Sequence, residues 1–279
     1  MIDQGIHEAA ADMGFQLLTT QDAKSNPDVE ENQLISLIQQ GADVIISVSN
    51  DHQNMVGAFT RIAHSKGTPV ILGSHLPLNL PDFCYRTCIA TSDEEKGRMV
   101  AKFLADEMQK KGQQKAVLIF DKNTYAGAQN CAASVINTLS NFYPKIQVLE
   151  QIINMKNSGA MMEFEAIYEA YPDLQGIYAQ DAGIAGNICE FLRNQGRGDV
   201  TVVTSQLNNR FARQILLHNI DSLGIASSRP IEMGHWMINA AASVILGKSI
   251  PQYITIEPVI LNNENVEELW PLLTRSKLV

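Results

Sequence analysis

The chain has 279 residues, a net charge of −9, 45% apolar residues and 18% charged residues. This length permits two domains with sizeable cores, and the composition excludes a disordered chain. The acidic balance excludes broad non-specific binding of nucleic acid. No apolar run reaches the roughly 18 residues of a membrane span, and no signal peptide is visible at the start. Four cysteines are too few for a disulfide scaffold and lack zinc-site spacing, so we expect buried thiols at Cys84, Cys88, Cys131 and Cys189.

Short apolar runs alternate with helical patterns at the spacing of βαβ units, which predicts an α/β fold with parallel sheets. The rhythm pauses between residues 74 and 92 and restarts with a helix over residues 92–111, where Ser92 and Glu95 form a capping-box pattern. Another helix is expected from Pro230 to Gly247. The expected strands are residues 15–18, 43–48, 69–72, 116–120, 146–150, 176–178, 200–203, 223–226 and 254–260.

The first residues have helical rather than strand spacing. Ile2, Ile6, Ala9, Ala10 and Met13 fall on one helical face. The sequence therefore opens on a helix with no strand before it, whereas a doubly wound domain normally begins with a strand.

Segments spread over nearly the whole chain carry a family resemblance by their order and spacing. They are residues 5–10, 14–17, 40–46, 67–71, 89–92, 171–181 and 200–203, together with Gly97, Pro230 and Gly234. This series resembles the periplasmic sugar-binding proteins of the ribose-binding type, which share the periplasmic binding protein type 1 fold with the effector domains of lactose-repressor regulators.

The resemblance implies two lobes, each a parallel sheet with helices on both faces, and three hinge crossings near residues 90–92, 227–230 and 261–263. The N-terminal lobe is expected to hold residues 1–91 and 229–261, and the C-terminal lobe residues 92–228 and 262–279. A ligand would bind between the lobes at the carboxyl ends of the strands and be enclosed by hinge closure. Family members have a strand before the first helix, so we expect a natural protein that is longer at its N-terminus.

Several pocket positions of the family are changed in this chain. The loop after residue 72 contains Ser74 and His75 in place of a charged pair, and His75 is either a ligand donor or a surface histidine. Tyr125 follows the strand at residues 116–120 and could stack on a sugar ring. The arginine of the family falls at Cys131, and its aromatic platform falls near Met155.

Asp181 matches the family pattern best among the candidate ligand contacts, and a helix N-cap is its alternative role. Gln206 stands where relatives usually have an aspartate, and its amide can still bind a hydroxyl. The second crossing supplies Ser228 and Arg229, and Arg229 would either clamp an acidic ligand or form a hinge ion pair.

Catalytic, cofactor and metal motifs are absent from the sequence, and the six histidines lack metal spacing. Asp121 and Asp181 both follow strands and could form an acid–base pair across the cleft, but a binding clamp also needs such groups. We therefore expect a protein that is not an enzyme and holds no cofactor.

Two functions stay open at this point. The first is a monomeric periplasmic or extracytoplasmic solute-binding protein that delivers a small polar ligand, a sugar or sugar derivative, to the membrane subunits of an ABC importer. The second is the cytoplasmic effector domain of a lactose-repressor-type regulator without its DNA-binding headpiece. The segment 254–267 resembles transport proteins more than repressors and favours the first.

Overall fold

The computed structural model of the chain divides into two compact units, which we describe one at a time. Unit 1 holds Met1–Ser92 and Arg229–Glu257, and unit 2 holds Asp93–Ser228 and Pro258–Val279. In the part of the chain that the structure describes, each helix is too short or too polar to span a bilayer. The described residues are 1–18, 22–24, 26–48, 57–59, 67–75, 80–121, 126–153, 159–218 and 220–278.

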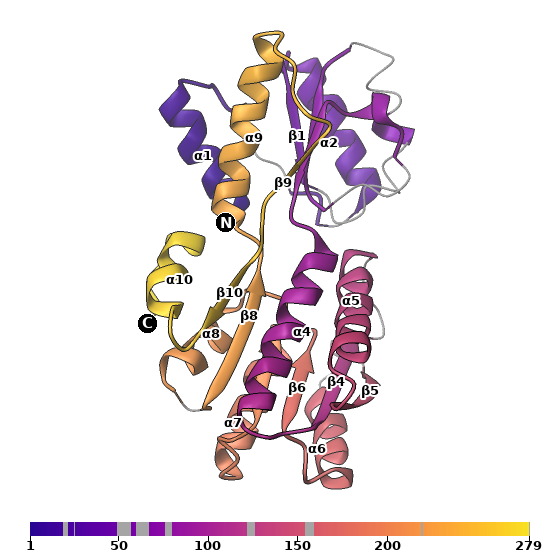
Figure 1. Cartoon of the computed structure of the whole chain (residues 1–279). Coiled ribbons are helices and arrows are strands. Elements are labelled where there is room, and N and C mark those ends of the chain that lie inside the picture. The colour runs from indigo at the N-terminus through magenta and orange to yellow at the C-terminus, as the bar shows by residue number, and fades with distance from the viewer. Residues whose placement is uncertain are drawn as a thin grey trace. The chain divides into compact units, whose positions relative to one another are not determined.

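Unit 1 is built on a parallel sheet whose strands run in the order β1-β2-β3-β9. Helix α2 covers one face through Leu34 and Ile38, while α9 and α1 cover the other (Figure 1). The strands are β1 (Ile45–Val48), β2 (Val70–Ser74), β3 (Thr87–Ala90) and β9 (Tyr253–Thr255), and the helices are α1 (Ile2–Met13), α2 (Pro27–Gln39), the short 3-10 helix η2 (Asp82–Cys84) and α9 (Pro230–Ile245).

Helices α1 and α9 pack closely because each has a glycine at the contact. A Cβ on Gly5 would lie 2.2 Å from the Ile231 carbonyl oxygen, and one on Gly234 would lie 2.4 Å from the Ile2 carbonyl oxygen. Neither position accepts a larger residue without moving backbone. The helical start of the sequence is thereby fixed against the helix that follows Pro230.

Unit 2 has a six-stranded sheet in the order β10-β8-β7-β6-β4-β5, in which only the β10–β8 pair is antiparallel. Helices α4 and α5 pack together on one face, and α6, α7, α8 and α10 lie on the other (Figure 1). The strands are β4 (Lys115–Asp121), β5 (Gln147–Ile153), β6 (Gly176–Ala179), β7 (Thr201–Thr204), β8 (Ser222–Ser227) and β10 (Val259–Asn262), and the helices are α4 (Asp93–Lys110), α5 (Ala126–Phe142), α6 (Ala160–Ala170), α7 (Ala182–Asn194), α8 (Asn209–Leu216) and α10 (Val266–Thr274).

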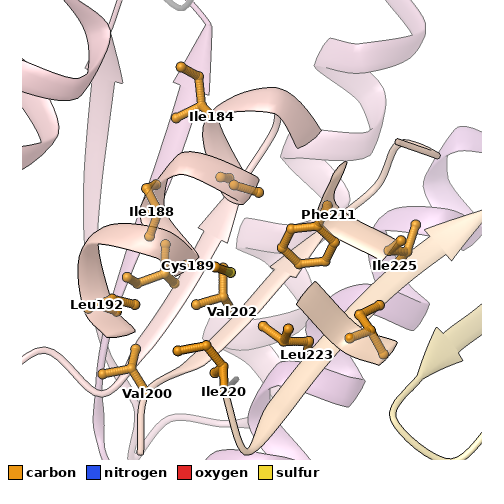
Figure 2. Packing of buried hydrophobic residues seen from close by; sticks show 14 of the residues in the cluster. Ile184, Ile188, Cys189, Leu192, Val200, Val202, Phe211, Ile220, Leu223 and Ile225 are labelled. Atoms are coloured by element: carbon orange, nitrogen blue, oxygen red, sulfur yellow. The ribbon is translucent and has the colours of Figure 1, made fainter. Parts of the chain in front are cut away.

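The core of unit 2 explains why its strands read as continuous apolar runs. Strands β6, β7 and β8 are buried along their whole length, so both faces carry apolar side chains. Figure 2 shows one face, where Phe211 of α8 and Ile188 of α7 meet Val202 of β7 and Leu223 of β8. All four side chains have no exposed surface.

Two expected strands differ from the structure. Residues 15–18 form no strand, and the Phe15 N–H bonds to the Ala10 carbonyl oxygen at 2.8 Å in the turn that ends α1. Residues 254–260 form no single strand but two, β9 in unit 1 and β10 in unit 2. Pro258, which has no N–H to donate, lies between them. The third crossing consequently lies at Glu257–Pro258, ahead of the expected residues 261–263, and residues 258–261 belong to unit 2.

Candidate functional site

Three polar residues form one row at the carboxyl edge of unit 2. The register pairs Ile119 of β4 with Ala179 of β6, and Tyr178 of β6 with Val203 of β7. Continuing this register past the ends of β6 and β7 predicts that the next polar residues lie at about one level, with neighbouring backbones about 4.8 Å apart. We call this set the outer row, and its members are Asp121, Asp181 and Gln206.

Asp181 is the N-cap of α7. Its Oδ1 accepts a hydrogen bond from the Ile184 N–H at 2.9 Å, and its backbone is extended, as the cap requires. No described residue bonds to Oδ2, so one carboxylate oxygen keeps its acceptor capacity. The cap therefore does not compete with a ligand contact for the same atom.

Gln206 is the second residue after β7 and is half-buried. Among the described residues nothing hydrogen-bonds to its amide, which offers both a donor and an acceptor. The preceding residue, Ser205, points inward, where its Oγ lies 3.0 Å from the hydroxyl of the buried Tyr178. The adjacent side chains of Ser205 and Gln206 therefore point to opposite sides at the end of β7.

The residue before Asp181 is also turned inward. Gln180 is 3% exposed, its Oε1 accepts from the Asp121 N–H at 2.8 Å, and its Nε2 donates to the Ala128 carbonyl oxygen at 2.9 Å. Gln180 and Ser205 therefore lie one residue behind the outer row, and we call them the inner row.

Cys131 on α5 lies beside the inner row. Its Sγ is 3.9 Å from the Tyr178 hydroxyl, and burial raises the pKa of the Cys131 thiol. A buried, protonated thiol is neutral. The position at which the resemblance places an arginine therefore carries no positive charge in this protein.

In unit 1, Ser74 and His75 lie at the carboxyl end of β2, and both are half-buried. Ser74 has φ +85°, an uncommon backbone conformation for a residue other than glycine, although it still pairs with Ala90. The His75 carbonyl oxygen accepts from Cys88 Sγ at 3.4 Å. Strained backbone of this kind is concentrated at binding and catalytic sites.

Ser228 is the last residue of unit 2 before the chain re-enters unit 1 at Arg229. The Ser228 carbonyl oxygen accepts from Ser227 Oγ at 2.5 Å. Arg229 forms an exposed ion pair with Glu232 at 3.3 Å, while its buried Nε has no hydrogen-bond partner among the described residues. Glu232 belongs to α9 in the same unit, so this pair does not connect the two units, and the expected roles of Arg229 stay predictions.

The remaining predictions have mixed outcomes. Tyr125 and Met155 lie outside the described residues. Asp121 ends β4 and Asp181 follows the neighbouring strand β6, so both belong to unit 2, and an acid–base role for the pair stays untested. The described residues contain no group of three or more His, Cys, Asp or Glu side chains placed to hold a metal ion.

Sequence reasoning missed the inner row. Gln180 stood within the motif that carried the resemblance but received no role. The available signal was alternation: side chains along a strand point to opposite sides, so a polar residue just before Asp181 faces the interior and needs buried partners. Ser205, just before Gln206, gives the same signal.

Comparison with known proteins agrees with this architecture. The family described as the periplasmic binding protein domain matches residues 2–249. No curated protein matches the chain significantly.

Solved structures share the fold at low sequence identity. A sugar-binding protein of a Bacillus halodurans ABC transporter is similar with a TM-score of 0.82 and 18% identity, covering 95% of this chain and 92% of that one. A carbohydrate transporter solute-binding protein from Agrobacterium radiobacter, in complex with D-arabinose, has a TM-score of 0.79 and 14% identity, with 98% and 93% coverage. A putative LacI transcriptional regulator from Bacteroides fragilis has a TM-score of 0.77 and 13% sequence identity, covering 95% of this chain and 92% of that one.

The family match covers most of the chain, and it agrees with the two α/β units and their parallel strands. The expected periplasmic binding protein type 1 fold is thereby confirmed. The chain belongs to the periplasmic binding protein domain family.

Proposed function

We propose that the chain is an extracytoplasmic solute-binding protein that captures a small polar, sugar-like ligand and delivers it to an ABC importer. The observation that carries the proposal is the family match over residues 2–249 together with the outer row at the carboxyl edge of unit 2. Open α/β sheets bind ligands at this edge. The binding of D-arabinose by the Agrobacterium protein and the sugar-transporter role of the Bacillus protein support the ligand class.

The chemistry of the outer row suits a polyhydroxylated ligand. Asp121 and Asp181 carry carboxylate acceptors, and Gln206 carries an amide that both donates and accepts. Each sugar hydroxyl can donate and accept hydrogen bonds, and neighbouring carbons of a sugar carry such hydroxyls. A row that contains both acceptors and a donor can bind them. A carboxylate accepting a hydroxyl proton forms a charge-assisted bond, which is stronger than a neutral one.

We propose further that unit 1 contributes Ser74, His75 and Arg229, and that unit 2 adds Tyr125, Met155 and Ser228 to the outer row. A ligand held by residues of both units links them, and hinge movement then encloses it. No membrane or cofactor chemistry is needed for this capture.

The test is a thermal-shift screen of the purified chain against D-arabinose, D-tagatose, D-fucose, D-glucose, D-galactose and glycerol. A sugar at 100 times its dissociation constant adds about 2.7 kcal/mol to the free energy of unfolding. The expected result is a raised Tm with at least one sugar. A folded protein whose Tm stays constant across the panel would contradict the proposed ligand class.

A second candidate function is effector binding by a lactose-repressor-type regulator, which the likeness to the Bacteroides fragilis regulator favours. The location of the protein in the cell distinguishes the two functions, because a solute-binding protein is exported from the cytoplasm and a regulator stays there. The measurement is immunodetection of the native protein in osmotic-shock and cytoplasmic fractions. Detection only in the cytoplasmic fraction would favour the regulator.

A further inference from the structure

Strand β6 is flanked by two glutamines that extend its pairing with β4 at both ends. The backbone register between these strands runs from the Ala116–Gly176 pair to the Ile119–Ala179 pair. Gln175 comes directly before β6, and Gln180 comes directly after it. Each side chain accepts a hydrogen bond from backbone N–H groups of the neighbouring β4 segment, as the next paragraphs describe.

At the carboxyl end, the backbone pairing gives way to a side chain. The Gln180 N–H still bonds to the Ile119 carbonyl oxygen at 3.0 Å. The next donor on β4, the Asp121 N–H, bonds instead to Gln180 Oε1 at 2.8 Å. The position of Asp121 relative to β6 is thus fixed by an amide side chain that is 3% exposed.

The other half of the same amide reaches α5. Gln180 Nε2 donates to the Ala128 carbonyl oxygen at 2.9 Å, in the first turn of that helix. A primary amide holds its donor and acceptor in a fixed planar fork, so both bonds depend on one side-chain orientation. One buried side chain therefore connects the end of β4, the end of β6 and the start of α5.

We propose that Gln180 is a positioning residue for ligand binding, which sets the relative placement of Asp121 and Asp181 without touching the ligand. This inference rests on the proposed function, because it assumes that the outer row binds the ligand. Gln180 immediately precedes Asp181, and it bonds the backbone of Asp121 directly. Loss of its amide removes the side-chain bonds to Asp121 and Ala128, while the backbone bond from the Gln180 N–H to the Ile119 carbonyl oxygen remains.

Gln175 provides a matched control on the same strand. Its Oε1 accepts from the Gln114 N–H at 2.8 Å and from the Lys115 N–H at 3.2 Å, at the amino end of β4. The substitutions Gln175→Met and Gln180→Met therefore remove the same kind of bond between the same two strands. They differ in which end of the strands is released, so a general loss of sheet stability affects both variants.

The first measurement is amide hydrogen exchange of the ligand-free protein by NMR. In Gln180→Met, the Asp121 amide is expected to exchange at least about tenfold faster than in wild type, because its N–H loses its acceptor. In Gln175→Met, faster exchange is expected at Gln114 and Lys115 instead. Unchanged exchange at Asp121 in Gln180→Met would overturn the proposal even if no sugar binds.

The second measurement is the dissociation constant of the tightest-binding sugar of the thermal-shift panel, by calorimetry. Gln180→Met is expected to weaken binding about tenfold, equivalent to about 1.4 kcal/mol, while Gln175→Met stays within about twofold of wild type. Equal weakening in both variants, or none in Gln180→Met, would overturn the proposal. A wild type that binds no sugar of the panel would count against the proposed function, while the exchange measurement still decides the role of Gln180.

Gln180→Glu tests the two bonds separately and replaces Gln180→Met if that variant does not fold. An ionised Glu accepts from the Asp121 N–H but cannot donate to the Ala128 carbonyl oxygen, whereas a protonated Glu can do both. The dissociation constant of Gln180→Glu divided by that of wild type is therefore expected to fall toward one as the pH is lowered from 8 to 5. A ratio above one that does not change over this range would contradict the role of the second bond.

Discussion

Asp181 has two roles that a pair of substitutions separates. Its Oδ1 caps α7 through the Ile184 N–H, while its Oδ2 is proposed to accept a ligand hydroxyl. Asparagine caps helices about as well as aspartate, but alanine does not. Asp181→Asn therefore keeps the cap and removes the charge, whereas Asp181→Ala removes both.

The two effects have different expected sizes. Loss of the cap costs about 1 kcal/mol of stability, within a range of about 0.5–2. In a unit of this size, 1 kcal/mol lowers the Tm by about 2–4 °C. A hydrogen bond to a charged group is worth about 1.5–3 kcal/mol, so its loss raises the dissociation constant by about 10-fold to 150-fold.

The assay combines urea unfolding with calorimetric titration of the tightest-binding sugar. Asp181→Asn is expected to unfold like wild type and bind more weakly, and Asp181→Ala to lose both stability and affinity. Asp181→Ser is the control for the cap, because serine also accepts the N-cap bond. Wild-type affinity in Asp181→Asn would refute the reasoning and leave Asp181 with its structural role alone.

Three other substitutions or reagents test the fold. Gly234→Ala is expected to destabilise unit 1 by about 1–3 kcal/mol in urea unfolding, because its Cβ would overlap α1 backbone. Gly186→Ala is expected to be tolerated, because its Cβ meets the Arg210 side chain and the Phe211 backbone nitrogen at ordinary van der Waals distances of 3.4–3.8 Å. Equal stability of the two variants would contradict the close packing of α1. Phe211→Ala, at a fully buried position, is expected to cost about 3–5 kcal/mol by the same assay, and a cost below 1 kcal/mol would place Phe211 outside the core. Burial raises the pKa of Cys88 to about 12, so this thiol stays protonated at pH 8 and is expected to react with a thiol reagent only after unfolding; rapid reaction in the native state would contradict its burial.

Much of the fold was predictable because buried parallel strands have a strong sequence signal. The run at residues 116–120 predicts β4, and the structure extends it by one residue at each end. The run at residues 254–260 was wrongly predicted to be one strand, because apolar character alone does not show which sheet a segment joins. Pro258 was the local signal for a break, since proline cannot donate to a ladder.

The candidate site was less predictable than the fold. Asp181 and Gln206 came from the family resemblance, and their contact with a ligand stays a prediction; the structure places both just after the ends of their strands. The inward roles of Gln180 and Ser205 depend on register and on contacts with Ala128 and Tyr178, which are distant in sequence. The positive φ of Ser74 has no sequence signal, because serine rarely adopts it.

The charge of the site leads to a prediction about ligand class. Continued by two residues, the register of β4 and β6 brings Asp121 and Asp181 close together in unit 2, and the buried thiol of Cys131 adds no positive charge. A carboxylate on a ligand bound at the outer row would lie near both aspartates, and its negative charge would be repelled by theirs. We therefore expect D-galactose to bind more tightly than D-galactonate, and D-glucose more tightly than D-gluconate.

Arg229 is the group that would reverse this order, because its exposed guanidinium carries a positive charge that would attract an acidic ligand. Titration calorimetry of each sugar and its acid measures the difference directly, and Arg229→Gln tests its origin. If the acids bind more tightly in wild type and lose that advantage in Arg229→Gln, the arginine outweighs the two aspartates and the expectation of a neutral ligand is wrong. If the neutral sugars bind more tightly in both proteins, the aspartates determine the preference, and the exposed pair of Arg229 with Glu232 is structural.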